Sequence, residues 1–342
     1  MSERKWNVRE YQPEDVHLVR DLYAKVFQQT RPLEHFIWRF HNNPTGRGVV
    51  MVAEDSDRIV GQYALMPTRL RLGSELVLGA QSLDTMTHPD YRNQGMFVAL
   101  AKACMQLAIS KGIEVLYGFP NQVSYHGFVY RLNWDHTGDI PTWVRTLNPG
   151  AIGSISRPIR YLAALGLPLW SMGNSAPHGI AIRTERPSLE ELVALADLQT
   201  PDESRGGCRI DRSIGWFKWR FDSESQRRYV WFSAYRGGNL KAWASFGLND
   251  WGEPPLIDMS GSEADALEAV VSRATRHAKQ LGLPQLRAVT NDRKAIRALK
   301  SCGYLQRVSL PLIVRSLTSR NMAENIHLHS SWRITSEDLD TF

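Results

Sequence analysis

The stretch THPDYRNQGMF (residues 87–97) joins two segments that have different hydrophobic patterns. GAQSLDTM (79–86), which precedes it, has the pattern of a strand. VALAKACMQLAISKG (98–112), which follows it, has the apolar spacing of a helix, and Gly112 is placed to end that helix. A polar, glycine-containing junction of this kind is either a plain turn or a binding site for an anion, and the short motif alone leaves both open.

Two residues of the junction suit an anion. The first N–H groups of a helix have no intrahelical partner and carry the positive end of the helix dipole. Gly95 has no Cβ, so a ligand can approach the backbone closely there. Arg92 adds a cation that can pair with phosphate oxygens through two N–H groups. The pattern therefore predicts a pyrophosphate cradle that is neither a Walker A loop nor a G-x-G-x-x-G dinucleotide loop.

The composition limits the number of domains and the kinds of ligand that the chain can have. Its 342 residues suit two domains, and 43% hydrophobic residues are enough to build two cores. The formal net charge of +6 permits either nucleic-acid binding or a small polyanionic ligand. No run of five like charges occurs in the sequence, which argues against a basic nucleic-acid-binding tail.

Three cysteines stand far apart without metal-ligand spacing, namely Cys104, Cys208 and Cys302. They predict a reducing compartment and no metal site. The charged start MSERKWNVRE does not resemble a signal peptide, so we expect a soluble, cytoplasmic protein without a membrane partner. The most apolar segment, RYLAALGLPLW (160–170), is too short to span a bilayer. It reads as an inter-domain helix, with a membrane-surface helix as the alternative.

The sequence also repeats itself. FIWRF (36–40) returns as FKWRF (217–221), an offset of 181 residues. An alanine follows each Trp by fifteen residues, Ala53 and Ala234, and a turn between apolar runs comes next, as in a β-hairpin. Because these tryptophans recur in both copies, we expect them to be core residues.

Two further pairs of segments match in the same order. VREYQP (8–13) corresponds to IRTERP (182–187), and KGIEVLYGFPN (111–121) corresponds to LGLPQLRAVTN (281–291). The chain is therefore two diverged copies of one αβ unit. The second copy is eleven residues shorter in the region of THPDYRNQGMF and has no Arg-x-x-Gly between its strand and helix.

The junction and a later segment resemble a known family. MTHPDYRNQGMFVAL (86–100) resembles motif A of the GNAT acetyltransferase superfamily, and GFPNQVSYHGFVYRLNW (118–134) is similar to its second signature. The match covers residues 1–145, and the second copy shares only the outline of the fold. The resemblance implies an α/β fold of the α+β kind with a mixed sheet, built as two tandem GNAT-like acyl-CoA acyltransferase modules.

The expected division of the chain follows from the repeat and the resemblance. Residues 1–148 form an N-terminal GNAT module with the acyl-CoA site, and 149–178 a linker helix. Residues 179–318 form a degenerate C-terminal GNAT-like module, and 319–342 a C-terminal tail.

The resemblance also implies a site for acetyl-CoA or another acyl-CoA, without a metal. The backbone of the loop would hold the pyrophosphate, through Arg92, Asn93, Gln94, Gly95, Met96 and Phe97. Met86, Thr87 and His88 would pair with the pantetheine arm, and Asn121 would bond it from the other side. Two positions depart from the family pattern, because Phe97 replaces a small residue and Asn133 replaces a glycine.

Acyl transfer to an amine requires a deprotonated amine and a proton for the leaving thiolate. Asp84 stands where many GNAT enzymes carry a base or a base-coordinated water; the alternative is an ordinary strand-end carboxylate. Tyr130 is one residue from the position of the superfamily's tyrosine acid, and Tyr125 is the second candidate; either can instead be a packed aromatic. His88 and His126 could act as bases, or be exposed or capping histidines.

Three functions remain open from the sequence. The first is an acyl-CoA-dependent N-acyltransferase that acetylates a primary amine of a small molecule, such as an amino-sugar, by direct transfer. The second is a non-catalytic acyl-CoA-binding or interaction protein on the same fold. The third is a nucleic-acid-binding protein, which rests on the net charge alone; we expect no nucleic-acid partner.

Overall fold

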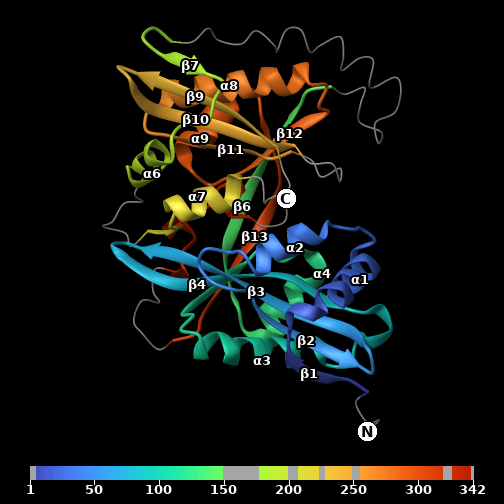
Figure 1. Ribbon diagram of the computed structural model, residues 1–342. Coiled ribbons are helices and arrows are strands. Elements are labelled where there is room, and N and C mark those ends of the chain that lie inside the picture. The colour runs from blue at the N-terminus through green and yellow to red at the C-terminus, as the bar shows by residue number, and fades with distance from the viewer. Residues whose placement is uncertain are drawn as a thin grey trace.

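The computed structural model describes residues 5–148, 177–198, 207–222, 228–248, 255–318 and 326–339. Among these residues, strands and helices pack in layers around one mixed sheet and one antiparallel sheet, which confirms the fold class expected from the sequence (Figure 1). The segment 160–170, expected as an inter-domain helix, lies outside the described residues.

The first copy of the repeat occupies the lower half of Figure 1. Its elements in chain order are β1 (Asn7–Glu10), α1 (Val16–Phe27), α2 (Leu33–Phe40), β2 (Val49–Asp55), β3 (Arg58–Leu72), β4 (Glu75–Thr87), α3 (Met96–Ser110), β5 (Val115–Gly118), α4 (Gln122–His126), a π-helical turn (Gly127–Arg131) and β6 (Asp135–Thr146). α3 follows β4 as the pattern around residues 87–97 predicts, and Gly112 ends it with a positive φ of 77°.

Most of the second copy occupies the upper half of the view, while its residues 208–210 and 313–316 pair with strands of the first copy. Its elements are β7 (Ala181–Arg183), α6 (Leu189–Asp197), β8 (Cys208–Ile210), α7 (Ile214–Phe221), β9 (Arg228–Arg236), β10 (Asn239–Leu248), β11 (Ile257–Gly261), α8 (Ala264–Gln280), β12 (Gln285–Val289), α9 (Arg293–Ser301), β13 (Leu305–Ser316) and β14 (Trp332–Arg333). Both hairpins expected from the repeat are present, as β2–β3 and β9–β10.

The two copies exchange a strand. β13 pairs with β5 over residues 313–316, so the last long strand of the second copy completes the sheet of the first. β6 pairs with β12 over residues 142–146, so the last strand of the first copy extends beside the second. β6 and β13 also pair with each other, and both run between the two halves in Figure 1. The halves are therefore joined by continuous backbone hydrogen bonding, and the division at residue 148 stays a prediction.

The repeated tryptophans meet at the centre of the molecule. Trp38 and Trp219 stack with ring centroids 4.6 Å apart and planes 14° apart. Each indole N–H donates to the other's backbone carbonyl oxygen, at 2.7 and 3.0 Å. Both side chains are buried, which confirms their expected core role. Because equivalent residues contact each other reciprocally, the two copies are related by a local two-fold axis that passes between these rings.

Candidate active site

The loop between β4 and α3 has the backbone of an anion cradle. Gly95 is the N-cap of α3 with a φ of 76°, a left-handed conformation that disfavours residues with a Cβ. A Cβ built there would meet no atom within 4 Å, so the space in front of the loop is open. The carbonyl of Gly95 accepts the first intrahelical bond, from Ala99 at 3.1 Å. The amides of Met96, Phe97 and Val98 precede that bond and remain available to an anion.

Neighbouring side chains hold the loop in place. The ring Nδ1 of His88 accepts from the amide of Asp90 at 3.3 Å, so this histidine caps the short turn Pro89–Tyr91. The side-chain oxygen of Gln94 accepts from the indole N–H of Trp6 at 3.2 Å. Asn93 has a φ of 64°, which asparagine tolerates better than most residues. Arg92 is exposed beside the cradle. These positions suit an anion bound by backbone amides and the exposed Arg92 side chain.

The two departures from the family pattern have local explanations. The ring of Phe97 turns away from the loop and packs edge-on against Phe128, with centroids 5.3 Å apart. Gly127 makes room for it, since a Cβ on Gly127 would lie 2.8 Å from the Phe97 ring. Asn133 has a φ of 53°, so it takes the left-handed position that a glycine would otherwise fill. Neither substitution fills the cradle.

β4 and β5 separate next to the loop. They pair in parallel over residues 79–82 of β4 only, while β4 itself continues to Thr87. Within the described chain, the last residues of β4 therefore have a partner strand on one edge, β3, and none on the other. A bulge lies at this point, where Asp84 and Thr85 face the single residue Tyr63 and Asp84 has a φ of 44°. The open edge includes Met86 and Thr87, as a strand-like pantetheine arm requires.

A pocket of about 260 Å³ opens at the separation of the strands. Its walls come from α1 and the loop after it, β4, β5, α4 and β13. They are lined by Tyr23, Phe27, Arg31, Ser82, Leu83, Asp84, Thr85, Gly118, Phe119, Pro120, Asn121, Ser124, Phe128 and Ile313. The pocket combines aromatic walls with a few polar groups, which is the usual composition of a small-molecule site.

Asp84 lies in this pocket in a cluster of charged side chains. Arg39 of α2 donates from Nη1 to Asp84 Oδ2 at 2.7 Å, and both side chains are largely buried. Arg39 Nη2 lies 2.8 Å from the ring Nε2 of His35. Arg31 Nη1 is 3.9 Å from the other carboxylate oxygen, Asp84 Oδ1. The bulge thus aims Asp84 at the pocket, and Arg39 fixes its orientation.

Asn121 lines the pocket together with residues 82–85 of β4, but its side-chain oxygen is occupied. It caps α4 by accepting from the amides of Val123 and Ser124, at 3.0 and 2.9 Å. The amide nitrogen of Asn121 is the group that could face a ligand. Ser124 also donates to Asn121 Oδ1 at 3.1 Å, so its hydroxyl lies in the pocket wall. Thr85 adds a buried hydroxyl that has no hydrogen-bond partner within the described chain. The sequence analysis did not single out Ser124, Thr85 or the two arginines.

The tyrosine candidates lie outside the pocket lining. Tyr130 is 67% exposed and packs against His126, with ring centroids 4.9 Å apart. The Tyr125 hydroxyl is 3.0 Å from Nδ1 of His136 on β6, whose Nε2 is 3.0 Å from Asp139. Desolvation raises the pKa of Tyr125 above its ordinary value. The structure therefore brings Asp84 and Asn121 together, and it places neither tyrosine nor His126 with them.

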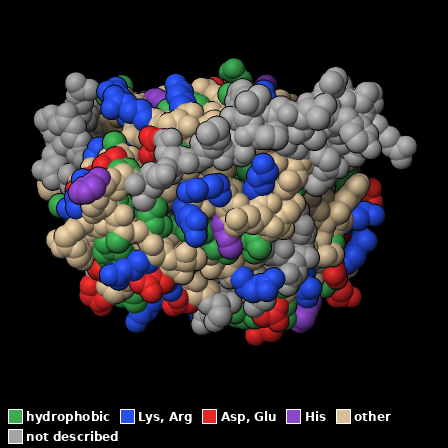
Figure 2. Space-filling view, turned by 90° about the horizontal axis from the view of Figure 1, so that it is seen from above, with side chains coloured by type: hydrophobic (Ala, Val, Ile, Leu, Met, Phe, Trp, Pro, Cys, Tyr) green, Lys and Arg blue, Asp and Glu red, His purple; other side chains and the backbone are tan. Residues whose placement is uncertain are grey.

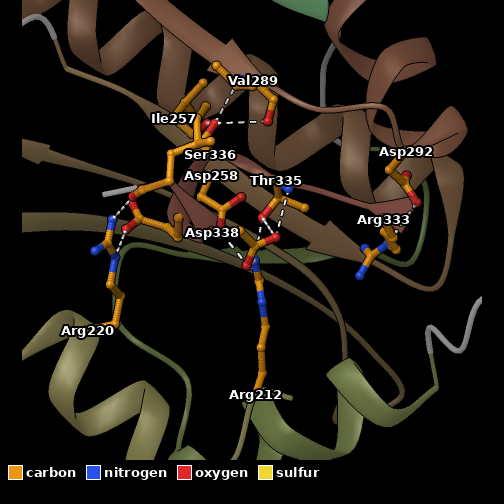
Figure 3. A network of polar contacts seen from close by, with 12 residues as sticks. Arg212, Arg220, Ile257, Asp258, Val289, Asp292, Arg333, Thr335, Ser336 and Asp338 are labelled. Atoms are coloured by element: carbon orange, nitrogen blue, oxygen red, sulfur yellow. Dashed lines mark hydrogen bonds and ion pairs between the residues drawn. The ribbon is translucent and has the colours of Figure 1, made fainter. Parts of the chain in front are cut away.

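The corresponding cleft of the second copy is closed by the chain itself (Figure 3). β11 and β12 are joined by a bridge between Leu256 and Arg287 and then separate, as β4 and β5 do in the first copy. Ser336, from the C-terminal segment, fills the gap. Its hydroxyl donates to the carbonyl of Ile257 at 2.8 Å and accepts from the amide of Val289 at 2.9 Å. In the first copy the corresponding gap between β4 and β5 opens into the pocket.

Other kinds of site find little support in the described part of the chain. No group of three His, Cys, Asp or Glu side chains there could hold a metal ion. No helix among those residues is long and apolar enough to cross a membrane. On the face seen in Figure 2, the coloured Lys and Arg side chains stand in separate groups and form no continuous stripe.

Comparison with known proteins identifies the class. Residues 7–137 match the family model described as acetyltransferase (GNAT) domain. A search of curated proteins finds no match. The fold is similar to that of a tandem GNAT protein from the clavulanic acid biosynthesis pathway, with 14% identity, a TM-score of 0.65, and coverage of 92% of this chain and 99% of that one.

Two further structures share the fold. One is a probable N-acyltransferase of unknown function from Enterococcus faecalis V583, with 11% identity, a TM-score of 0.64, and coverage of 92% and 73%. The other is the N-myristoyltransferase of Saccharomyces cerevisiae with bound myristoyl-CoA, with 11% identity, a TM-score of 0.64, and coverage of 91% and 83%. The protein is an acyl-CoA N-acyltransferase by class. Its N-terminal half is a GNAT acetyltransferase domain, and the whole chain has the tandem GNAT fold.

Proposed function

We propose that this protein transfers an acyl group, acetyl in the simplest case, from acyl-CoA to the primary amine of a small molecule. The observation that carries the proposal is the position of the pocket, which opens where β4 and β5 separate, beside the cradle at Gly95. Bound acyl-CoA would supply the acyl carbon as an activated thioester. An N–C bond forms as the C–S bond breaks, and the proton that the amine loses balances the one that the thiol gains.

The residues have separate roles in this proposal. The amides of residues 93–97, with Arg92, hold the pyrophosphate. The open edge of β4 from Met86 to His88 holds the arm on one side, and the amide nitrogen of Asn121 on the other. Asp84 takes the proton of the amine, directly or through a water. Tyr130 as the acid stays a prediction from the sequence, and its exposed position does not favour that role.

We further propose that the chain has one acyl-CoA site. The second copy lacks the Arg-x-x-Gly loop, and Ser336 occupies the gap between its strands. A second molecule of cofactor would have to displace a buried segment that is held by several hydrogen bonds and ion pairs.

Two measurements test these proposals. Calorimetric titration with coenzyme A should give one site per chain, and two equal sites would contradict the single-site assignment. Thiol release from acetyl-CoA is then measured against a panel of primary amines. Tight binding of coenzyme A without thiol release for any amine would favour the non-catalytic acyl-CoA-binding alternative.

A further inference from the structure

The wall of the pocket that α1 supplies lies on the opposite face of the sheet from the cradle. α1 packs into the core cluster that includes Val50 and Val52 of β2, whereas α3 packs into the one that includes Val49 and Met51. Alternate residues of a strand point to opposite faces of its sheet, so the two helices cover opposite faces (Figure 1). A cofactor with its pyrophosphate at the N-terminus of α3 would reach this wall only with its acyl end. Side chains of α1 in the pocket therefore face the acceptor and the acyl group.

This wall is aromatic. Phe27, the last residue of α1, and Tyr23, one helical turn before it, both line the pocket. Their ring centroids are 4.7 Å apart, with planes 48° apart. Phe119 and Phe128 line the pocket from other elements. Tyr23 is buried, but Phe27 is 37% exposed, and apolar surface in water is unfavourable. A ligand that covers the Phe27 ring would remove this apolar area from water.

The polar side chains of the pocket have a different distribution. Most of them are on β4 and at the start of α4, namely Ser82, Asp84, Thr85, Asn121 and Ser124. The loop after α1 contributes Arg31, which lies 3.9 Å from Asp84 and 5.0 Å from the centroid of the Tyr23 ring, so it has partners within the protein. An acceptor with its amino group at Asp84 thus has polar surroundings at that end and aromatic rings at the other.

We infer that the acceptor is a primary amine that carries an apolar ring, with its amino group at Asp84 and its ring against Phe27 and Tyr23. The pocket volume of about 260 Å³ is just below the usual range for drug-sized ligands, about 300–1,000 Å³, and suits a compact amine with one ring. A ring that lies among aromatic side chains gains edge or offset contacts beyond its loss of exposed area. The hydroxyl groups of an amino-sugar would lose water against these rings without regaining hydrogen bonds. The inference rests on the proposed acyltransferase function and names its substrate class.

Three acceptors test this inference by thiol release from acetyl-CoA: phenethylamine, ethylamine, which has the same amino end without the ring, and glucosamine. Wild type should prefer phenethylamine to each of the others by at least about 10-fold in kcat/KM, because its ring is removed from water. Phe27→Ala should lower the ratio of phenethylamine to ethylamine by about 3- to 10-fold with unchanged affinity for coenzyme A, and Phe27→Leu should lower it less. Leu281→Ala, at an exposed leucine that follows α8 outside the pocket lining, is the matched control and should behave as wild type.

The outcomes separate the two proposals. If Phe27 only supports the fold, Phe27→Ala melts lower and slows both amines equally, and the unchanged ratio overturns the inference. A preference for ethylamine or glucosamine overturns it too, while the acyltransferase function survives. If no amine turns over, the same three are titrated into the protein saturated with coenzyme A. Selective binding of phenethylamine, weakened in Phe27→Ala, supports the inference, and no binding of phenethylamine overturns it. Failure to bind coenzyme A at all refutes the proposed function itself.

Discussion

Two glycines at opposite ends of α3 allow a sharp test of the cradle. Gly95 precedes the helix and Gly112 follows it, with φ values of 76° and 77°. A Cβ added at either would meet no atom within 4 Å. Replacing either glycine with glutamate therefore imposes the same backbone strain, about 1–2 kcal/mol for a left-handed residue with a side chain. Only Gly95→Glu places a carboxylate in front of the amides that are proposed to hold the pyrophosphate.

The two substitutions should rank in opposite order for loss of stability and for loss of coenzyme A binding. A glutamate at the N-terminal end of a helix is favoured by the helix dipole by about 0.3–1 kcal/mol, and one at the C-terminal end is disfavoured by a similar amount. Gly112→Glu should therefore be the less stable variant. Two like charges about 4 Å apart repel by about 1 kcal/mol in water and about 4 kcal/mol near a protein surface. Gly95→Glu should thus weaken coenzyme A binding by roughly 10- to 1,000-fold.

Calorimetric titration with coenzyme A measures the affinity of each variant, and thermal melts without coenzyme A measure its stability. We expect Gly112→Glu to melt lower than Gly95→Glu and to bind coenzyme A as wild type does. If Gly95→Glu binds coenzyme A with wild-type affinity, or if both variants lose affinity equally, the loop does not hold the pyrophosphate.

Three other predictions follow from the site and its surroundings. Asp84→Asn should lower kcat by about 10²–10⁴-fold with unchanged affinity for coenzyme A, whereas Tyr130→Phe should change kcat little; an equal loss in both would restore the tyrosine as the acid. Gly127→Ala should destabilise the fold by about 1–3 kcal/mol, because its Cβ meets the Phe97 ring at 2.8 Å, and Phe97→Leu in the same chain should restore part of the melting temperature. Burial and the nearby tail carboxylates raise the pKa of Asp258 to about 7, so the folded state holds its proton more tightly than the unfolded chain and loses stability as pH rises from about 4 to about 7. Asp258→Asn should therefore gain in melting temperature relative to wild type between pH 5 and pH 8, and parallel pH profiles would contradict this.

Features that depend on neighbours in the sequence could be predicted from it. The strand, loop and helix around residues 87–97 follow from apolar spacing and from one glycine. The repeat predicts both hairpins and the buried pair Trp38 and Trp219. Each of these rests on contacts within a few residues or on a pattern that occurs twice.

Features that depend on distant segments could not be predicted. Nothing in the local pattern of β6 or β13 says which strands each will pair with. Tyr130 is a candidate only through its position relative to the superfamily's tyrosine. It lies in the turn Gly127–Arg131, which is π-helical, and such a turn directs its side chains differently from an α-helix. Arg39 lies inside the repeated FIWRF motif, and its return as Arg220 was the available signal for a charged cluster. The carboxylate that pairs with Arg220 could not be predicted, because it comes from the C-terminal segment, more than 100 residues away.

The second copy contributes to the pocket of the first copy although it has no Arg-x-x-Gly loop of its own. Ile313 of β13 lines the pocket of the first copy, and β13 is the strand beside β5. The second copy therefore supplies a wall of the candidate active site, and this contribution comes from its strand and not from a cofactor loop. Arg212 and Arg220 persist in that copy as buried cations, and a buried cation without a carboxylate is strongly destabilising. Glu337 and Asp338 provide those carboxylates. The C-terminal segment thus fills the cleft of the second copy, whereas the cleft of the first copy opens into the pocket.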